Sequence, residues 1–142
     1  MFKTPDTLNV DHLVIGASAM GKAFVATLVS DIRATVALVD RYDRPGGHWT
    51  LAYPYIRLHQ PSEFYGVNSR PLGEGKLDAV GWNRGLSELA TGDEVCAYYN
   101  AVMQQTLFSS GRVQSFPKHR YPGDGSFRSI LTGEFFTVGD ST

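Results

Sequence analysis

The stretch VDHLVIGASAMG, at residues 10–21, decides the fold. Its first half, Val10–Ile15, is a largely apolar run, which is typical of a short strand buried on both faces. The run stops at Gly16, and small residues lead from there to Gly21. Apolar side chains then recur at helical spacing over Met20–Val29. We therefore expect a strand, a tight turn and a helix in direct succession.

A second strand is expected soon after that helix. The run TVALV, at residues 35–39, is rich in β-branched side chains and ends at Asp40. Strand, helix and strand in this order form a βαβ unit, whose two strands lie parallel in one sheet. The expected fold class is therefore α/β, with helices packed against a parallel sheet.

The turn between the first strand and the helix has a nucleotide-binding pattern. A dinucleotide pyrophosphate needs main-chain N–H groups at a helix N-terminus, and glycines there let it approach the backbone closely. The usual pattern is GxGxxG, whereas this chain has Gly16, Ser18 and Gly21. The serine hydroxyl can donate a hydrogen bond to a phosphate. The alternative is that the glycines serve only the close packing of strand and helix.

Asp40 stands where a ribose would be recognised. Eighteen residues separate it from Gly21, so its carboxylate falls at the C-terminal end of the second strand. There it can accept hydrogen bonds from a ribose 2′-hydroxyl. Alternatively, it is a solvated strand end of an ordinary α/β protein. Arg41 and Arg44 flank it and could receive a 2′-phosphate, although solvated loop charges are the simpler interpretation.

After Asp40, glycine and proline interrupt the regular apolar patterns. Between residues 41 and 93 they recur so often that we expect long loops with short helical turns. TGDE, at residues 91–94, has the spacing of a capping box and predicts a helix that ends near Gly111. Three further strands are expected, the last two as a hairpin: Arg112–Phe116, Phe127–Leu131 and Glu134–Val138.

Size and composition limit the classes of function. The 142 residues suit one domain. Thirteen Lys and Arg against fourteen Asp and Glu leave no excess positive charge, so neither nucleic acid nor a membrane is an expected partner.

The single cysteine, Cys96, excludes an internal disulfide, fits a cytoplasmic location and is assigned no redox role. No metal site is expected, because no ligand spacing joins the four histidines: His12, His48, His59 and His119.

The segment RPGGHW, at residues 44–49, resembles the GGxW segment of flavin-containing and Baeyer–Villiger monooxygenases. The resemblance continues through residues 53–62 and 65–73 and is loose from Asp93 onward. It implies a Rossmann-like FAD/NAD(P)-binding domain, incomplete here, with an antiparallel hairpin as an excursion from the parallel sheet. It also implies the residues that contact FAD: Gly16, Ser18, Ala19, Met20 and Gly21 at the pyrophosphate, Asp40 at the ribose, and Gly47, His48, Trp49, His59 and Gln60 nearer the flavin.

By this resemblance, the chain is the FAD-binding N-terminal portion of an NAD(P)H-dependent flavin oxidoreductase of the monooxygenase type. Residues 1–142 would form one domain, truncated at its C-terminus, because no second glycine fingerprint for NAD(P)H follows Gly21. We therefore expect FAD binding with little turnover, and a second chain or a C-terminal domain as partner. The substrate and the catalytic residues are not indicated. Two alternatives stay open: a non-catalytic NAD(P)-binding module, which has no reason to carry GGHW, and an inactive fragment.

Overall fold

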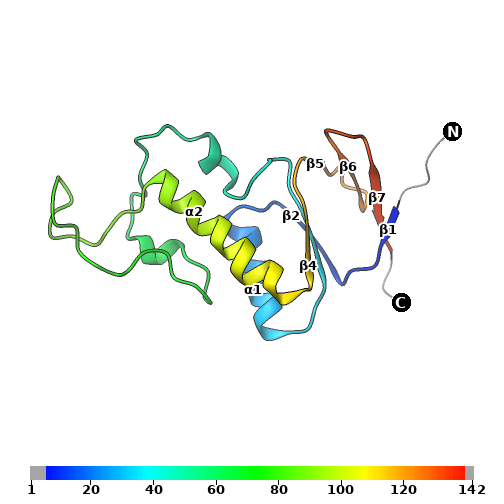
Figure 1. The fold of residues 1–142 in the computed structure, drawn as a ribbon, viewed down its shortest axis with the longest axis horizontal. Coiled ribbons are helices and arrows are strands. Elements are labelled where there is room, and N and C mark those ends of the chain that lie inside the picture. The colour runs from blue at the N-terminus through cyan, green and yellow to red at the C-terminus, as the bar shows by residue number, and fades with distance from the viewer. Residues whose placement is uncertain (1–5, 140–142) are drawn as a thin grey trace.

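The computed structural model describes residues 6–139, which are arranged in three layers (Figure 1). Within these residues, two α-helices make the first layer, a three-stranded parallel sheet the second, and a four-stranded mixed sheet the third. The expected α/β class, with a parallel sheet and an antiparallel excursion, is confirmed. No helix within residues 6–139 has the length and apolar character that crossing a membrane requires.

The parallel sheet has the order β2-β3-β4, so β3 lies in the middle. β2 spans His12–Ile15, β3 spans Val36–Val39 and β4 spans Val113–Phe116. All four residues of β3 are fully buried, as expected for a strand with neighbours on both edges and layers on both faces. The three strands expected from the sequence are confirmed, and their ends differ from expectation by at most two residues.

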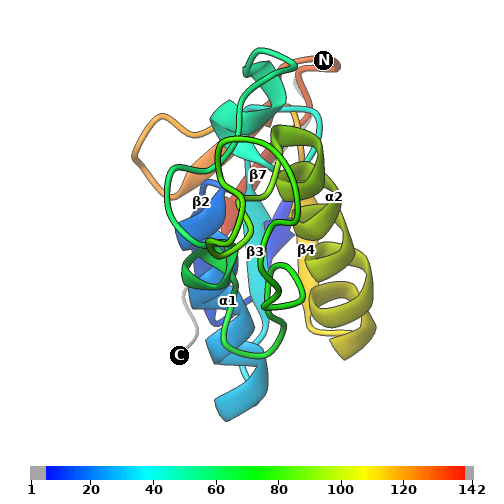
Figure 2. The same cartoon turned by 90° about the vertical axis from the view of Figure 1, so that its left-hand side faces the viewer.

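Helices α1 (Ala19–Asp31) and α2 (Gly92–Val102) lie side by side on one face of the parallel sheet (Figure 2). The expected capping box starts α2. Thr91 Oγ1 accepts a hydrogen bond from the Glu94 N–H at 3.1 Å, and Glu94 Oε2 accepts one from the Thr91 N–H at 3.3 Å. The buried faces of both helices form the core with β3, and the fully buried side chains there include Val25, Leu38, Tyr99 and Val102.

The helical rod continues beyond α2. It passes through a π-helical turn, η3 (Met103–Leu107), and a 3₁₀ turn, η4 (Phe108–Ser110). It ends at Gly111, whose φ of +70° is the left-handed conformation that terminates many helices. The expected end of the capped helix is therefore confirmed, although its last two turns are not α-helical.

The mixed sheet has the order β1-β7-β6-β5. Its strands are β1 (Asp6–Leu8), β5 (His119–Arg120), β6 (Ser126–Ser129) and β7 (Phe135–Val138). The expected hairpin is β6 and β7, which pair antiparallel. The expected strand end at Leu131 is wrong, because the Gly133 N–H donates to Ser129 O at 3.0 Å and the chain already turns there.

An aromatic cluster joins the two sheets. Phe116, at the end of β4, packs on Phe127 of β6 and Phe136 of β7, with ring centroids 4.8 and 5.2 Å away. The His119 ring lies 5.5 Å from Phe116. The cluster therefore packs β5, β6 and β7 of the mixed sheet against the C-terminal end of β4.

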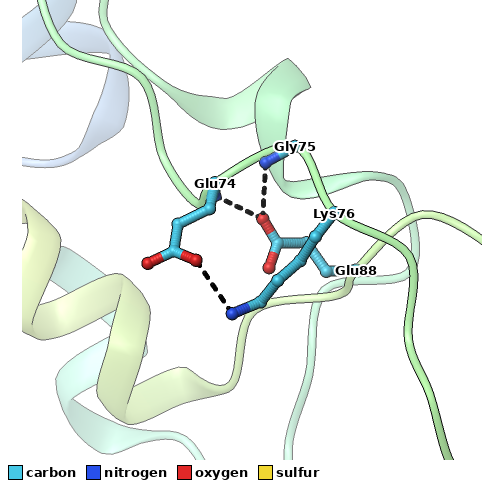
Figure 3. A network of polar contacts seen from close by, with 4 residues as sticks. All are labelled: Glu74, Gly75, Lys76 and Glu88. Atoms are coloured by element: carbon cyan, nitrogen blue, oxygen red, sulfur yellow. Dashed lines mark hydrogen bonds and ion pairs between the residues drawn. The ribbon is translucent and has the colours of Figure 1, made fainter.

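The connection from β3 to α2 contains two short 3₁₀ turns, η1 (Gly47–Leu51) and η2 (Ser62–Tyr65), and otherwise loops, as expected. Residues 74–88 project from the body as an excursion (Figure 1). Its base is held by Glu88, whose Oε1 accepts hydrogen bonds from the N–H groups of Glu74 and Gly75 (Figure 3). Lys76 Nζ pairs with Glu74 Oε2 at 2.9 Å beside it.

Candidate functional site

The turn between β2 and α1 requires glycine at both ends. Gly16 has a φ of +99°, and its N–H donates to Val39 O at 2.7 Å, which ties the turn to the end of β3. A Cβ at Gly21 would lie 1.8 Å from Gly16 O, so no larger residue fits there. The first turn of α1 therefore packs directly on the glycine turn. Its N–H groups, which have no acceptor within the helix, lie at the C-terminal ends of β2 and β3.

The GGHW segment packs against this turn. Gly47 is buried with a φ of +56°, and a Cβ at that position would come within 2.9 Å of Ser18 Cβ. Ser18 is the N-cap of α1, but its side chain makes no capping hydrogen bond. The structure therefore brings together the glycine turn and the GGHW segment, which were expected to belong to one site.

Asp40 closes the turn from the other side. Its carboxylate is nearly buried; Oδ2 accepts a hydrogen bond from the Ala17 N–H at 2.6 Å and Oδ1 accepts one from the Tyr42 N–H at 3.0 Å. A carboxylate has about four lone-pair sites, so these two bonds leave acceptor capacity for a ribose hydroxyl. The role at a ribose remains a prediction, whereas the tie to Ala17 was not foreseen.

A cleft of about 840 Å³ opens where these parts meet. Among the expected site residues, five line it: Gly16, Ser18, Asp40, Gly47 and His48. It lies at the C-terminal ends of β2 and β3, which is the edge where open α/β sheets bind ligands. Ala19, Met20 and Gly21 follow in the first turn of α1. The Met20 side chain is 80% exposed and does not line the cleft. The backbone N–H of Met20, in the first turn of α1, is the group that is directed toward the C-terminal ends of the strands.

Three other expected residues lie outside the cleft lining. Trp49 is half-buried against the core, with its ring 5.2 Å from that of His48. His59 and Gln60 are exposed beside η2, where the His59 ring lies 6.4 Å from the Tyr65 ring and Gln60 Oε1 lies 3.4 Å from the Tyr65 hydroxyl. Their contact with a flavin remains a prediction.

A basic segment that was not expected from the sequence, Lys118–Tyr121, lines the same cleft. It follows β4, and parallel pairing brings the end of β4 beside the end of β3. The Lys118 N–H donates to Tyr42 O and the His119 N–H to Asp40 O, both at 2.9 Å. The sequence does contain a signal for this segment. The basic run KHR, at residues 118–120, follows the expected parallel strand Arg112–Phe116, and the end of that strand lies at the same edge of the sheet as the cleft.

Lys22, one residue after the glycine turn, is fully buried. Its Nζ has no hydrogen-bond partner among the described residues and lies 4.7 Å from the centroid of the Tyr99 ring. Burial lowers the pKa of the Lys22 ammonium to about 8, and the nearby Asp40 carboxylate opposes part of that effect. Burial also raises the pKa of Tyr99 to about 12. A desolvated cation therefore lies behind the turn that was expected to hold a phosphate group.

Burial raises the pKa of the Cys96 thiol, so the thiol stays protonated at neutral pH and is a poor nucleophile. Within residues 6–139, no three His, Cys, Asp or Glu side chains are grouped as a metal site requires. The cleft itself presents backbone N–H donors, positive charge and one buried carboxylate, that of Asp40.

No protein-family model matches the chain. Uncharacterised proteins of Mycobacterium tuberculosis and Mycobacterium bovis are 56% identical to it over 129 residues, which is 91% of this chain and 24% of theirs. The chain therefore spans about a quarter of the length of the curated relatives that it matches.

Among solved structures, the flavin-containing monooxygenase of Stenotrophomonas maltophilia matches with a TM-score of 0.61 at 19% identity, over 94% of this chain and 36% of that one. The chain has the fold of part of a flavin monooxygenase. The closed crystal structure of cyclohexanone monooxygenase matches with a TM-score of 0.57 at 22% identity, over 95% of this chain and 25% of that one. At these identities the likeness is one of fold.

Proposed function

We propose that this chain is the FAD-binding portion of an NAD(P)H-dependent flavin oxidoreductase of the monooxygenase type. The observation that carries the proposal is the packing of Gly47 against Ser18, which joins the GGHW segment to the glycine turn at the helix N-terminus. Flavin monooxygenases share the fold over nearly the whole of this chain, which supports a flavin rather than another nucleotide.

The features of the cleft fit a dinucleotide. Gly16 and Gly21 leave the main chain bare where the turn meets α1, so N–H groups of Ser18, Ala19, Met20 and Gly21 can donate to a pyrophosphate. Asp40 would accept from the ribose, and Lys118 and Arg120 would complement the negative charge. Gly47, His48, Trp49, His59 and Gln60 are proposed on the flavin side.

In this proposal the cofactor supplies the redox chemistry, and the chain supplies binding, orientation and charge. Residues 1–142 are proposed to act as one domain of a larger enzyme, since the chain covers 24% of its relatives' length. NAD(P)H as reductant, a small-molecule substrate and the rest of the enzyme as partner belong to that larger protein. The isolated chain would bind FAD with little turnover.

A non-catalytic NAD(P)-binding module is the second candidate. Arg41, Lys118 and Arg120 line the cleft around Asp40, and this positive charge would suit the 2′-phosphate of NADP as well as a pyrophosphate. The two candidates differ in the ligand that the folded chain retains.

Replacing Ser18 by Asp tests the proposed phosphate site. Aspartate is as good an N-cap as serine, so the helix should form, but its charge would repel a pyrophosphate at the same position. We expect FAD affinity to fall at least about tenfold, a loss that a repulsion above about 1.4 kcal/mol produces. Ser18→Asn is the matched uncharged control and should bind nearly as the parent chain does. Equal affinities of the two variants, by fluorescence titration, would overturn the assignment.

A further inference from the structure

Lys22 is a buried cation without an acceptor for its charge. Its side chain is fully buried, and its Nζ has no hydrogen-bond partner among the described residues. The ring of Tyr99, 4.7 Å from Nζ, replaces only part of what water would provide. Buried lysines are normally paired, because removing an unpaired charge from water is unfavourable. Folding alone therefore gives no reason for a charge at this position.

The ammonium lies behind the turn that joins β2 to α1. Lys22 is the fourth residue of α1, and a helical side chain leans toward the N-terminus of its helix, so its stem covers the first turn, which starts after Ser18. Nζ extends from there toward Tyr99 of α2, the helix that lies beside α1 (Figure 2). The same first turn carries the N–H groups that have no acceptor within the helix.

The two glycines of the GGHW segment cover the space between the helices. A Cβ at Gly47 would lie 2.9 Å from Ser18 Cβ, at the start of α1, and a Cβ at Gly46 would lie 3.3 Å from Cys96 Sγ of α2. The segment therefore reaches from one helix to the other above the Lys22 side chain and helps to exclude water from it. A charge that water does not screen acts over a longer distance than a surface charge does.

The charged and titratable groups that act on Lys22 come from β3, α2 and the loop between them. The Asp40 carboxylate attracts the ammonium, but it already accepts two backbone N–H groups and it would repel a phosphate at the same turn. On α2, burial raises the pKa of Cys96 and of Tyr99, so both are neutral at pH 7. The exposed Arg44 acts on Cys96 from the loop. Lys22 is thus the buried charge that offsets Asp40.

We propose that the buried Lys22 ammonium is a determinant of phosphate binding at the N-terminus of α1, where it attracts the pyrophosphate of a dinucleotide through the glycine turn rather than by contact. It acts in the same direction as the positive end of the α1 dipole. The inference rests on the proposed function in that the ligand is a dinucleotide, and it applies to FAD and NADP alike.

Fluorescence titration of this chain and of Lys22→Met with FAD tests the inference. At pH 7 the variant should bind FAD at least about fivefold more weakly, because it lacks an unscreened charge behind the pyrophosphate. Circular dichroism should show that the variant is folded, since methionine retains the apolar stem and removes an unpaired buried charge. Lys76→Met, which removes an exposed lysine from the excursion, is the matched control and should bind as the parent chain does.

The dependence of affinity on pH separates the effect of the charge from an effect on packing. The pKa of Lys22 is about 8, so the ammonium of the free chain loses its proton between pH 7 and 9. The FAD affinity of the parent chain should fall over this interval, whereas that of Lys22→Met should stay nearly constant. The difference between them should therefore narrow to less than about twofold at pH 9.

Equal FAD affinities of Lys22→Met and the parent at pH 7 would overturn this inference and leave the flavin proposal standing. A difference that persists unchanged at pH 9 would also overturn it, because the substitution would then act through packing. If the folded parent binds NADP but not FAD, the flavin proposal fails, and the same comparison with NADP decides the role of Lys22. A folded parent chain that binds neither dinucleotide would contradict both.

Discussion

Replacing Lys22 by methionine should make the chain more stable at neutral pH. The ammonium is fully buried without a hydrogen-bond partner among the described residues, and burial lowers its pKa from 10.5 to about 8. Each pKa unit corresponds to about 1.4 kcal/mol, so holding the charged form in the folded state costs about 3 kcal/mol. Methionine retains the apolar stem but loses the contact with the Tyr99 ring, which is worth about 1 to 2 kcal/mol. The expected net gain is about 1 to 2 kcal/mol.

The dependence of this gain on pH identifies its cause. Below pH 8 the folded and unfolded states both hold the Lys22 proton, and the full penalty applies. Between about pH 8 and 10.5 the unfolded state binds more protons than the folded state, so the stability of the parent chain rises with pH. The advantage of the methionine variant should therefore shrink across this interval.

Urea unfolding, followed by tryptophan fluorescence at several pH values, measures both effects. Lys76→Met is the control, because Lys76 is exposed and its ion pair with Glu74 lies at the surface; it should change stability little at any pH. A Lys22→Met variant that is less stable than the parent at pH 7, or a stability difference that does not vary with pH, would refute the reasoning.

Three further substitutions test other parts of the structure. Asp40→Asn should lower the free energy of unfolding by about 2 kcal/mol, because an amide NH₂ group would then face a backbone N–H of Ala17 or Tyr42; urea unfolding measures this. Thr91→Ala should remove the capping box of α2 and cost about 1 kcal/mol, seen as an earlier thermal transition by circular dichroism. Phe127→Ala should cost about 3 to 5 kcal/mol, because its buried ring joins the two sheets; the soluble folded fraction reports it.

Each of these has a control. Asp40→Glu retains the charge, and a loss no smaller than that of the asparagine variant would show that geometry rather than charge is decisive. Thr91→Ser retains the capping hydroxyl and should melt with the parent chain. Leu131→Ala removes a side chain that is 77% exposed and should be nearly neutral, so an effect equal to that of Phe127→Ala would contradict the proposed core.

The elements with strong local signals were predictable. The largely apolar runs at residues 10–15 and 35–39 predicted β2 and β3, and the capping box at Thr91 predicted the start of α2. Strands β1 and β5 were not foreseen, because they have three and two residues and exist only through pairing with β7 and β6. For β1 the partner strand lies 130 residues further along the chain, and local sequence contains no signal for it.

The candidate site, too, was predictable from the sequence only in part. Gly16, Ser18 and Gly21 follow from the pattern between strand and helix, and the GGHW resemblance located Gly47 beside them. The bond from Ala17 to Asp40 and the lining by Lys118–Tyr121 depend on how parallel strands end together, which spacing alone does not specify. Lys22 was overlooked, because a lysine in an amphipathic helix is normally expected on its solvated face.

The measurement that tests the central claim most directly is the visible absorbance spectrum of the purified, folded chain after incubation with FAD and removal of free dye. We predict a retained flavin spectrum in the parent chain and in Ser18→Asn, and its loss in Ser18→Asp. A folded parent chain that retains no FAD but binds NADP would contradict the flavin proposal and favour the nicotinamide-binding module.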